Sequence, residues 1–322
     1  MRLASFAAKE SERIGIVLGE LAFDLVDAAG RLSQKFPYSN MMDVIAGGTD
    51  ALAALGKMKK AIEAAPEHFD GISLSQIVLR PPVRSPSKIV CLALNNSANA
   101  DRIMKGPKHP ATFIKPASAL IGHGDAIKCR PNYGRVHPEP ELALVIGRTA
   151  YEVPAERAYE YVFGYTIHND ITSPTMRDED TFHYRAIHPK KGSETDVEYV
   201  DSWVSYPGRY KGSDTFACMG PWLVTKDDIP DPHALDVSCS HNGKLVTKDN
   251  TANLFHKTPE VIAFLTRCMT LHPGDIISLG TALKAGAAGG AVQNIDLNRL
   301  GGEVSVEIEG IGTLVNGVAH LP

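Results

Sequence analysis

Two glutamates stand two residues apart, just before an apolar run, and they are the clearest candidates for chemistry in the chain. The segment reads His-Pro-Glu139-Pro-Glu141 and continues into the apolar residues 142–146. Because side chains two apart on a strand point to the same face, these carboxylates would lie side by side, about 6 to 7 Å apart. Like charges at a core boundary need a proton or a cation, and Mg²⁺ or Mn²⁺ prefers oxygen ligands. The alternative is a solvated strand end with two exposed glutamates.

A third carboxylate closes a second apolar run. Asn169 and Asp170 follow residues 164–168, which read Gly-Tyr-Thr-Ile-His. An aspartate at this place is often a turn residue. Together with Glu139 and Glu141, however, Asp170 would supply a third protein oxygen and leave about three positions of an octahedral ion for water or substrate. This pattern indicates an open, catalytic metal site.

The elements that must position these residues are mostly short strands. Many short strands with few helices predict an α+β, mostly β, architecture rather than regular βαβ repeats. A proline-rich stretch at residues 80–87 predicts a boundary between a small N-terminal domain (1–80) and a catalytic domain (81–322). Strands are predicted at residues 14–18, 21–26, 88–94, 142–146, 164–168, 216–224, 237–240, 244–247 and 303–309, and helices at 50–64, 155–162 and 258–269.

Composition excludes several classes of protein. A net charge of −4 gives no general attraction to nucleic acid or to an anionic membrane. No apolar run of about 18 residues predicts a membrane span, and the N-terminal segment lacks the apolar core of a signal peptide. The five cysteines are odd in number and contain no CxxC, which is typical of reduced thiols. A cytoplasmic protein is therefore expected, and it lacks the common nucleotide-binding and serine-hydrolase motifs.

An ordered set of motifs over residues 80–318 resembles the fumarylacetoacetate hydrolase superfamily. The resemblance implies a mixed β-sandwich roll, usually a homodimer, with Mg²⁺ or Mn²⁺ bound by the three carboxylates. It makes Lys211 the lysine that reaches the oxygens of a 2-oxo acid substrate, and Thr281 a carboxylate-binding hydroxyl. The N-terminal unit resembles the small extra domain of some members. The motifs are Glu139-x-Glu141, Asn169-Asp170, Lys211-Gly-Ser-Asp, Met219-Gly-Pro-Trp, Asn242-Gly243 and Leu279-Gly-Thr281.

Two short segments depart from the family's pattern. Many hydrolytic members carry His-x-x-Glu in a lid helix and use that pair to activate water, but here Asn99 and Arg102 stand in those places. Neither can accept a proton at neutral pH, so Asn99 is kept only as a substrate-binding candidate. Many members have Ala-Arg-Asp-x-Gln after the Asn-Asp motif, where this chain has Ser-Pro-Thr-Met-Arg177.

Forty residues separate the Asn-Asp motif from Lys211, more than in short members. The additional segment is either a solvated loop or a lid that supplies replacement groups. In the second case His183 and His188 are candidate bases, because histidine titrates near working pH. Arg185, together with Arg177, is then a candidate for binding the far carboxylate of a diacid.

Three hypotheses about function follow, of which two are enzymatic and one is not. The first is a hydrolase that cleaves a 2,4-dioxo acid of the acylpyruvate or fumarylpyruvate type between C3 and C4, giving pyruvate and a carboxylic acid. The second is an isomerase, decarboxylase or hydratase that uses the same metal-enolate chemistry on a 2-oxo or 2-hydroxy-dienoic acid. The third is a non-catalytic metal- and ligand-binding relative, against which the carboxylates and Lys211 argue.

Overall fold

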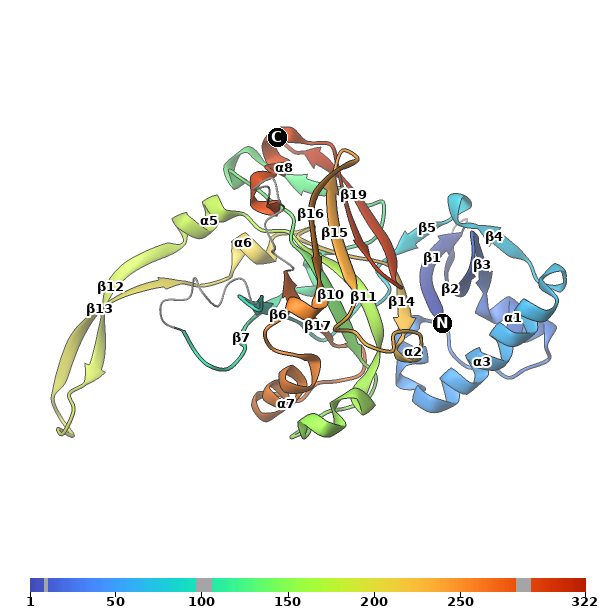
Figure 1. Ribbon diagram of the computed structural model, residues 1–322, viewed down its shortest axis with the longest axis horizontal. Coiled ribbons are helices and arrows are strands. Elements are labelled where there is room, and N and C mark those ends of the chain that lie inside the picture. The colour runs from blue at the N-terminus through green and yellow to red at the C-terminus, as the bar shows by residue number, and fades with distance from the viewer. Residues whose placement is uncertain (9–10, 97–105, 282–290) are drawn as a thin grey trace.

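A large mixed sheet runs through the molecule, and the computed structural model describes residues 1–8, 11–96, 106–281 and 291–322 (Figure 1). Twelve strands of the described residues form this sheet. Their bounds are β1 (Arg2–Ala8), β2 (Ser11–Leu18), β3 (Leu21–Asp24), β4 (Gly71–Ser73), β5 (Val78–Arg80), β6 (Ile89–Ala93), β7 (Ala111–Lys115), β8 (Leu120–Ile121), β10 (Pro140–Ile146), β11 (Val162–Asp170), β14 (Ala217–Thr225) and β17 (Ile276–Thr281). The main path is β4-β3-β2-β1-β14-β11-β10-β17-β6-β7.

A second sheet packs against one face of the first. Its order is β16-β15-β18-β19-β9. The hairpin between β15 and β16 turns at Asn242 and Gly243, both with positive φ, as the Asn-Gly pair predicted. The bounds are β9 (Ile127–Cys129), β15 (Asp236–His241), β16 (Lys244–Asn250), β18 (Glu303–Ile308) and β19 (Gly312–His320).

Strand β10 is buried on both faces, which explains its continuous apolar sequence. Leu142 and Leu144 lie in the core between the two sheets. Ala143 and Val145 lie in a second core on the opposite face, together with residues of the N-terminal helices. Because Glu141 is two residues before Ala143, its side chain belongs to the face away from the five-stranded sheet.

The N-terminal unit shares its sheet and its core with the rest of the chain. Strand β1 pairs with β14, where Leu3 lies opposite Leu223. Both leucines belong to one apolar cluster with helix residues such as Leu55. The predicted domain boundary near residue 80 stays a prediction. The helices of this unit are α1 (Leu25–Arg31), α2 (Met41–Ala46) and α3 (Gly48–Ala64), and α3 confirms the predicted helix.

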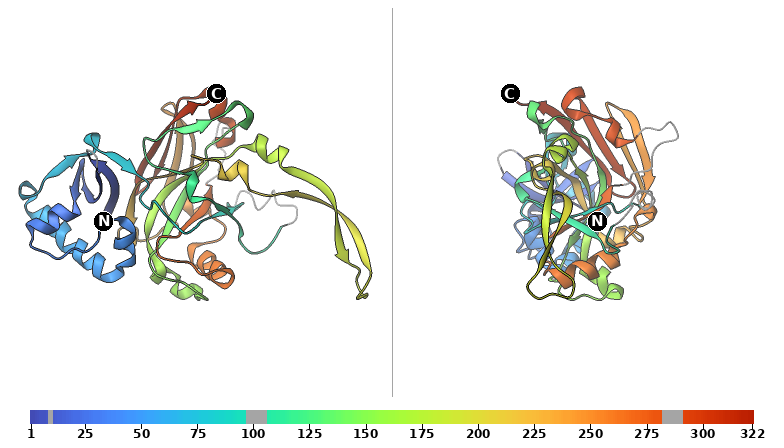
Figure 2. Two further views of the ribbon diagram at one scale, coloured as in Figure 1. Left: turned by 180° about the vertical axis from the view of Figure 1, so that it is seen from behind. Right: turned by 90° about the vertical axis from the view of Figure 1, so that its left-hand side faces the viewer.

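The segment inserted before Lys211 is a β-ribbon rather than a loop, and its predicted role as a lid stays a prediction. It consists of the antiparallel strands β12 (Thr181–Pro189) and β13 (Val197–Ser205), which among the described strands pair only with each other. This ribbon, residues 181–205, projects far from the body in the left-hand view of Figure 2 and is called the arm below. Short helices α5 (Pro174–Glu179) and α6 (Arg209–Gly212) stand at its base, and the remaining helices are α7 (Thr258–Cys268) and α8 (Leu297–Leu300).

Most predicted strands are confirmed, and the differences are local. The predicted helix at residues 155–162 is a 3₁₀ turn, Ala155–Tyr161, and the first strand, β1, was not predicted. All five cysteines are free, and four of them are buried, as expected for small core residues. No helix of the described residues is long and apolar enough to cross a membrane.

Candidate functional site

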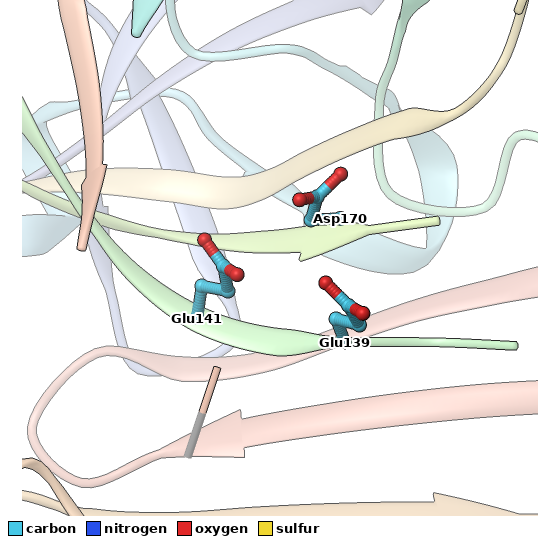
Figure 3. Close-up of side chains that lie close together, drawn as sticks. All are labelled: Glu139, Glu141 and Asp170. Atoms are coloured by element: carbon cyan, nitrogen blue, oxygen red, sulfur yellow. The ribbon is translucent and has the colours of Figure 1, made fainter. Parts of the chain in front are cut away.

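The three predicted carboxylates converge at one edge of the large sheet (Figure 3). In the register of β10 and β11, Pro140 faces Asn169 and Glu141 faces His168, which sets Asp170 beside Glu139. The Asp170 N–H donates to the Glu139 carbonyl over 2.9 Å. One oxygen of each carboxylate lies within 4.8 Å of the others. The predicted convergence is confirmed, and metal ligation by these groups stays a prediction.

Two lysines bring positive charge into this cluster. Lys211 Nζ, from α6, lies 2.7 Å from Glu139 Oε2 and 2.7 Å from Asp170 Oδ2. Lys115, the last residue of β7, is fully buried and pairs with Asp170 Oδ1. It also donates to the Ile171 carbonyl over 3.2 Å. Asp170 is thus held by an ammonium group on each of its oxygens.

These contacts set the charge states. Burial alone would raise the pKa of Glu139, but Lys211 and His137 lower it well below its ordinary value. Burial likewise opposes ionisation of Asp170, and Lys115 and Lys211 outweigh it, so the pKa of Asp170 is also lowered. Burial would lower the pKa of Lys211, but Asp170 and Glu139 raise it above its usual range. All three groups are therefore charged at neutral pH.

Glu141 is held by neutral donors instead. The Ser278 hydroxyl donates to Glu141 Oε2 over 2.5 Å, and the Thr281 hydroxyl donates to Oε1 over 3.0 Å. The Gly280 N–H adds a third bond of 3.2 Å. Gly280 has a φ of +92°, and a Cβ there would lie 2.9 Å from Asn95 Cβ, so glycine suits this position.

The residues present fit a divalent cation. Three converging carboxylates face two lysine ammonium groups, which leaves one buried negative charge uncompensated. The ligand atoms on offer are all carboxylate oxygens, the kind that Mg²⁺ and Mn²⁺ prefer. Glu139, Glu141 and Asp170 are thus the residues that would hold such an ion.

A cavity of about 800 Å³ opens onto these groups. Glu139, Lys211 and Thr281 line it, and the Lys211 ammonium lies 5.0 Å from the centre of the Phe113 ring. Two further lining residues are basic and exposed: Arg177 in α5, at the base of the arm, and Arg135. The cavity therefore joins one cationic group beside the carboxylates to two more near solvent.

Three predicted site residues do not line this cavity, and their proposed roles stay predictions. His183, His188 and Arg185 are exposed on β12, and none of them lines the cavity. The cause is local pairing, because β12 and β13 pair with each other along their whole length, and this satisfies the backbone groups between the two strands without the body. Arg185 pairs with Asp201, at 3.3 Å from Nε to Oδ1. Asn99, like Arg102, lies outside the described residues.

Sequence reasoning missed several groups at the site. Lys115 has the same strand parity as the buried Phe113, and a lysine on an inward face is a signal that could have found it. His137 shares parity with Glu139, and its Nε2 lies 3.0 Å from Glu139 Oε1. Ser278 follows no recognisable motif. It links Glu141 to His168, whose Nδ1 lies 2.7 Å from the Ser278 hydroxyl.

Comparison with known protein families identifies the family to which this chain is related. The model of the family described as Fumarylacetoacetate (FAA) hydrolase C-terminal matches residues 88–319. The chain belongs to the fumarylacetoacetate hydrolase family. The matched residues include all three carboxylates, both lysines and Thr281, while most of the N-terminal unit lies outside the match.

Relatives within the fumarylacetoacetate hydrolase family carry different activities in their names. The mitochondrial oxaloacetate tautomerase Fahd2a of Rattus norvegicus is 33% identical over 248 residues, 77% of this chain and 71% of that protein. Maleylpyruvate hydrolase from Sphingobium sp. SYK-6, solved with manganese(II) and pyruvate, matches over 100% of both chains with a TM-score of 0.71 and 29% identity. 5-Carboxymethyl-2-hydroxymuconate delta-isomerase from Mycobacterium smegmatis matches over 100% of both chains, with a TM-score of 0.67 and 26% identity. The family therefore includes hydrolases, isomerases and tautomerases with this fold.

Proposed function

We propose that this protein is a Mg²⁺- or Mn²⁺-dependent hydrolase that cleaves a 2,4-dioxo acid between C3 and C4. The products would be pyruvate and a second carboxylic acid, and the substrate would be of the acylpyruvate or fumarylpyruvate type. The observation that carries this proposal is the contact of Lys211 with both Glu139 and Asp170 at a wall of the cavity. It sets a permanent ammonium beside the carboxylates, where the oxygens of a 2-oxo acid would bind.

Thr281 and Lys211 have different roles in the proposed reaction. The Thr281 hydroxyl, which lines the cavity, would bind the substrate carboxylate, and Lys211 would bind the neighbouring keto oxygen. When hydroxide adds to C4, the C3–C4 bond breaks and its electron pair moves onto the pyruvate part as an enolate. Lys211 stabilises that negative charge, and a proton then returns to C3. A bound divalent cation would add further positive charge for the same enolate.

The exposed arginines support a substrate with a second carboxylate. Arg135 donates to the Gln293 carbonyl over 2.7 Å, which fixes one guanidinium beside the cavity. Arg177 carries a second guanidinium group, and both arginines line the same cavity as Lys211. A four- or five-carbon acyl group ending in a carboxylate would join the two cationic ends. The maleylpyruvate hydrolase of Sphingobium is named for a substrate of this kind.

One observation favours the second hypothesis, an isomerase, tautomerase or decarboxylase. Among the described lining residues, the only imidazole and the only carboxylate are His137 and Glu139, and they are bound to each other. Loss of CO₂ needs Lys211 and the cation but no activated water, whereas proton transfer at C3 needs a base for that proton but likewise no activated water. His183 and His188 lie on the arm, so they would reach a cavity only in another copy of the chain.

A single NMR experiment separates these activities. The protein would be incubated in D₂O with Mg²⁺ and without Mn²⁺. Acetylpyruvate, fumarylpyruvate and oxaloacetate would each be added in a separate incubation. Cleavage of a dioxo acid to pyruvate supports the hydrolase, and deuteration at C3 without cleavage supports the isomerase or tautomerase. Parallel His183→Ala and His188→Ala variants test the arm, because only hydrolysis should fall if either residue supplies the base.

We also propose a cytoplasmic location and a homodimeric assembly for the protein. The free thiols of all five cysteines support the first. The arm supports the second, because among the described strands β12 and β13 pair only with each other and leave large apolar side chains exposed.

A further inference from the structure

A row of fully buried side chains crosses the face of the large sheet that carries Glu141. Glu141 on β10 faces His168 on β11, and Ser278 lies on the neighbouring strand β17. Met219 and Cys91 extend the row to β14 and β6, because they pair with His168 and Ser278. Each of the five side chains belongs to a residue that is at most 1% exposed. Three polar groups are therefore enclosed in the core between two sulfur-bearing side chains.

The number of protons in this row gives its hydrogen bonds one direction. Ser278 has a single hydroxyl proton, which goes to Glu141 Oε2 over 2.5 Å, because an ionised carboxylate can only accept. His168 Nδ1 lies 2.7 Å from the same hydroxyl oxygen, so a proton on Nδ1 must complete this second bond. The chain of hydrogen bonds therefore runs from the His168 N–H through the Ser278 O–H to the Glu141 carboxylate.

The other ring nitrogen of His168 argues against a role in core packing alone. Nε2 is buried and has no hydrogen-bond partner among the described residues. A buried polar atom without a partner lowers stability, and an apolar side chain of similar size would avoid that cost. The advantage of a histidine at this position then lies in the bond that its ring does make, which is the bond to Ser278.

The two oxygens of Glu141 are held unequally. Oε2 accepts from both the Ser278 hydroxyl and the Gly280 N–H. Oε1 lies 3.0 Å from the Thr281 hydroxyl, but Glu139 Oε2 lies 3.2 Å from that same hydroxyl. One hydroxyl proton cannot serve both carboxylates at once. Oε1 is therefore the oxygen with more free lone pairs, and it shares its donor with the neighbouring carboxylate.

We propose that Ser278 and His168 are positioning residues that hold Glu141 ready for the divalent cation. Two donors fix Oε2, and the His168 N–H keeps the Ser278 hydroxyl proton directed at Glu141, which leaves Oε1 for the ion. Hydrogen bonds of this kind orient metal ligands, and their loss weakens metal binding by about 10- to 100-fold. This inference rests on the proposed metal dependence, and it does not depend on which reaction the enzyme catalyses.

The first test is Mn²⁺ titration calorimetry of the metal-free protein. Ser278→Ala should raise the Kd for Mn²⁺ by about 10- to 100-fold, although all three carboxylates remain. Thr266→Val is the matched control and should leave the Kd unchanged, because the Thr266 hydroxyl is equally buried but donates within α7, to the Ile262 carbonyl over 2.8 Å. An unaltered protein that binds no Mn²⁺ overturns the proposed metal dependence together with this inference. Equal Kd values for Ser278→Ala and the control overturn this inference alone.

A pair of His168 variants separates positioning from packing. The amide nitrogen of asparagine can take the place of Nδ1, whereas that of glutamine reaches the place of Nε2. His168→Asn should therefore keep most of the affinity for Mn²⁺, and His168→Gln should lose as much affinity as Ser278→Ala. A packing role alone predicts the reverse order, because asparagine leaves the larger cavity. The reverse order, or the same Kd for both variants, contradicts the proposal.

NMR of the metal-free protein tests the direction of the chain without any variant. The ring nitrogens of His168 would be observed in protein labelled with ¹⁵N and assigned through bonds from the His168 backbone. We expect a proton on Nδ1 that exchanges slowly with solvent, because His168 is fully buried. A bare Nδ1 would mean that Ser278 donates to the histidine instead of to Glu141, and the proposal would then be wrong.

Discussion

The ammonium nitrogen of Lys211 and Oδ2 of Asp170 lie 2.7 Å apart, although β11 and α6 are separated in sequence by the whole arm. The same nitrogen lies 2.7 Å from Glu139 Oε2, so one lysine joins the carboxylates of two neighbouring strands. Since Asp170 and Glu139 raise the pKa of Lys211 despite its burial, this group stays an ammonium at any working pH. A permanent positive charge thus lies where the 2-oxo acid is proposed to bind.

Replacing Lys211 with methionine should lower kcat by roughly 10²-fold or more, the scale of losing one charge-stabilising donor. Binding of Mn²⁺ should persist, because the three carboxylates remain and lose a competing cation. Turnover and Mn²⁺ titration calorimetry of the Lys211→Met variant check both parts, with the exposed Lys244→Met as the control. A loss confined to KM would instead assign Lys211 to uniform substrate binding.

Removing the Glu141 carboxylate should abolish metal-dependent turnover. Glu141 is 1% exposed, and it is the one of the three carboxylates without a lysine partner within 4 Å among the described residues. Its charge is therefore the one most in need of a cation. The activity of the unaltered protein should fall after exhaustive chelation and return when Mn²⁺ is added. The Glu141→Ala variant should stay inactive when Mn²⁺ is added. Full activity after chelation would exclude a metal role for this cluster.

Lys115→Met should destabilise the protein strongly. Lys115 and Asp170 form a fully buried ion pair, and removing one partner of such a pair costs about 3 to 5 kcal/mol. The exposed pair Arg185–Asp201 provides the contrast, because Arg185→Met should cost no more than about 1 kcal/mol. Urea unfolding of both variants measures the difference. Equal effects would mean that solvent or another group already compensates Asp170.

Stability of the metal-free protein should decline in acid. The pKa of Glu139 and that of Asp170 are lowered from 4.5 and 3.8, so the unfolded state takes up protons first as the pH falls. The free energy of unfolding should therefore be constant near neutral pH and fall below about pH 4.5. As the pH falls, the free energy of unfolding of the Asp170→Asn variant should decrease less than that of the unaltered protein, by up to about 1.4 kcal/mol per pH unit. Urea unfolding with chelator present, from neutral pH downwards, measures the free energy of unfolding of both proteins. If Asp170 does not contribute, the two proteins will show the same slope of this free energy against pH.

Arg177→Ala should change substrate preference rather than general activity. Arg177 lines the cavity and is exposed to solvent, so we expect only the binding of a substrate with a far carboxylate to be affected by its loss. We expect KM for a diacid such as fumarylpyruvate to rise about 10-fold or more, while acetylpyruvate kinetics change little. Arg148→Ala, which removes a guanidinium stacked on Tyr161, is the control. Equal effects on both substrates would contradict a role in binding the far carboxylate.

Strand periodicity predicted that Glu139 and Glu141 share a face of one strand. Asp170 closes the neighbouring strand, and the resemblance to the family was needed to assign it to the same site. Lys115 was missed because its contact with Asp170 depends on the curvature of the sheet, which brings the edge strand β7 back to β11. The place of His183 and His188 could not be predicted either, because the sequence of an amphipathic ribbon does not say what it packs against.

The pairing of β1 with β14 affects how the chain folds during synthesis. Arg2 and Leu3 leave the ribosome more than two hundred positions before their partners Val224 and Leu223. Translation proceeds at about 5 to 20 residues per second, so the first strand must wait roughly 10 to 40 seconds for this neighbour. During that interval the edge of β1 at Arg2 and Leu3 remains open to other chains, because β5 pairs only with residues 5–7, and chaperones that shield exposed strand edges would act at this stage.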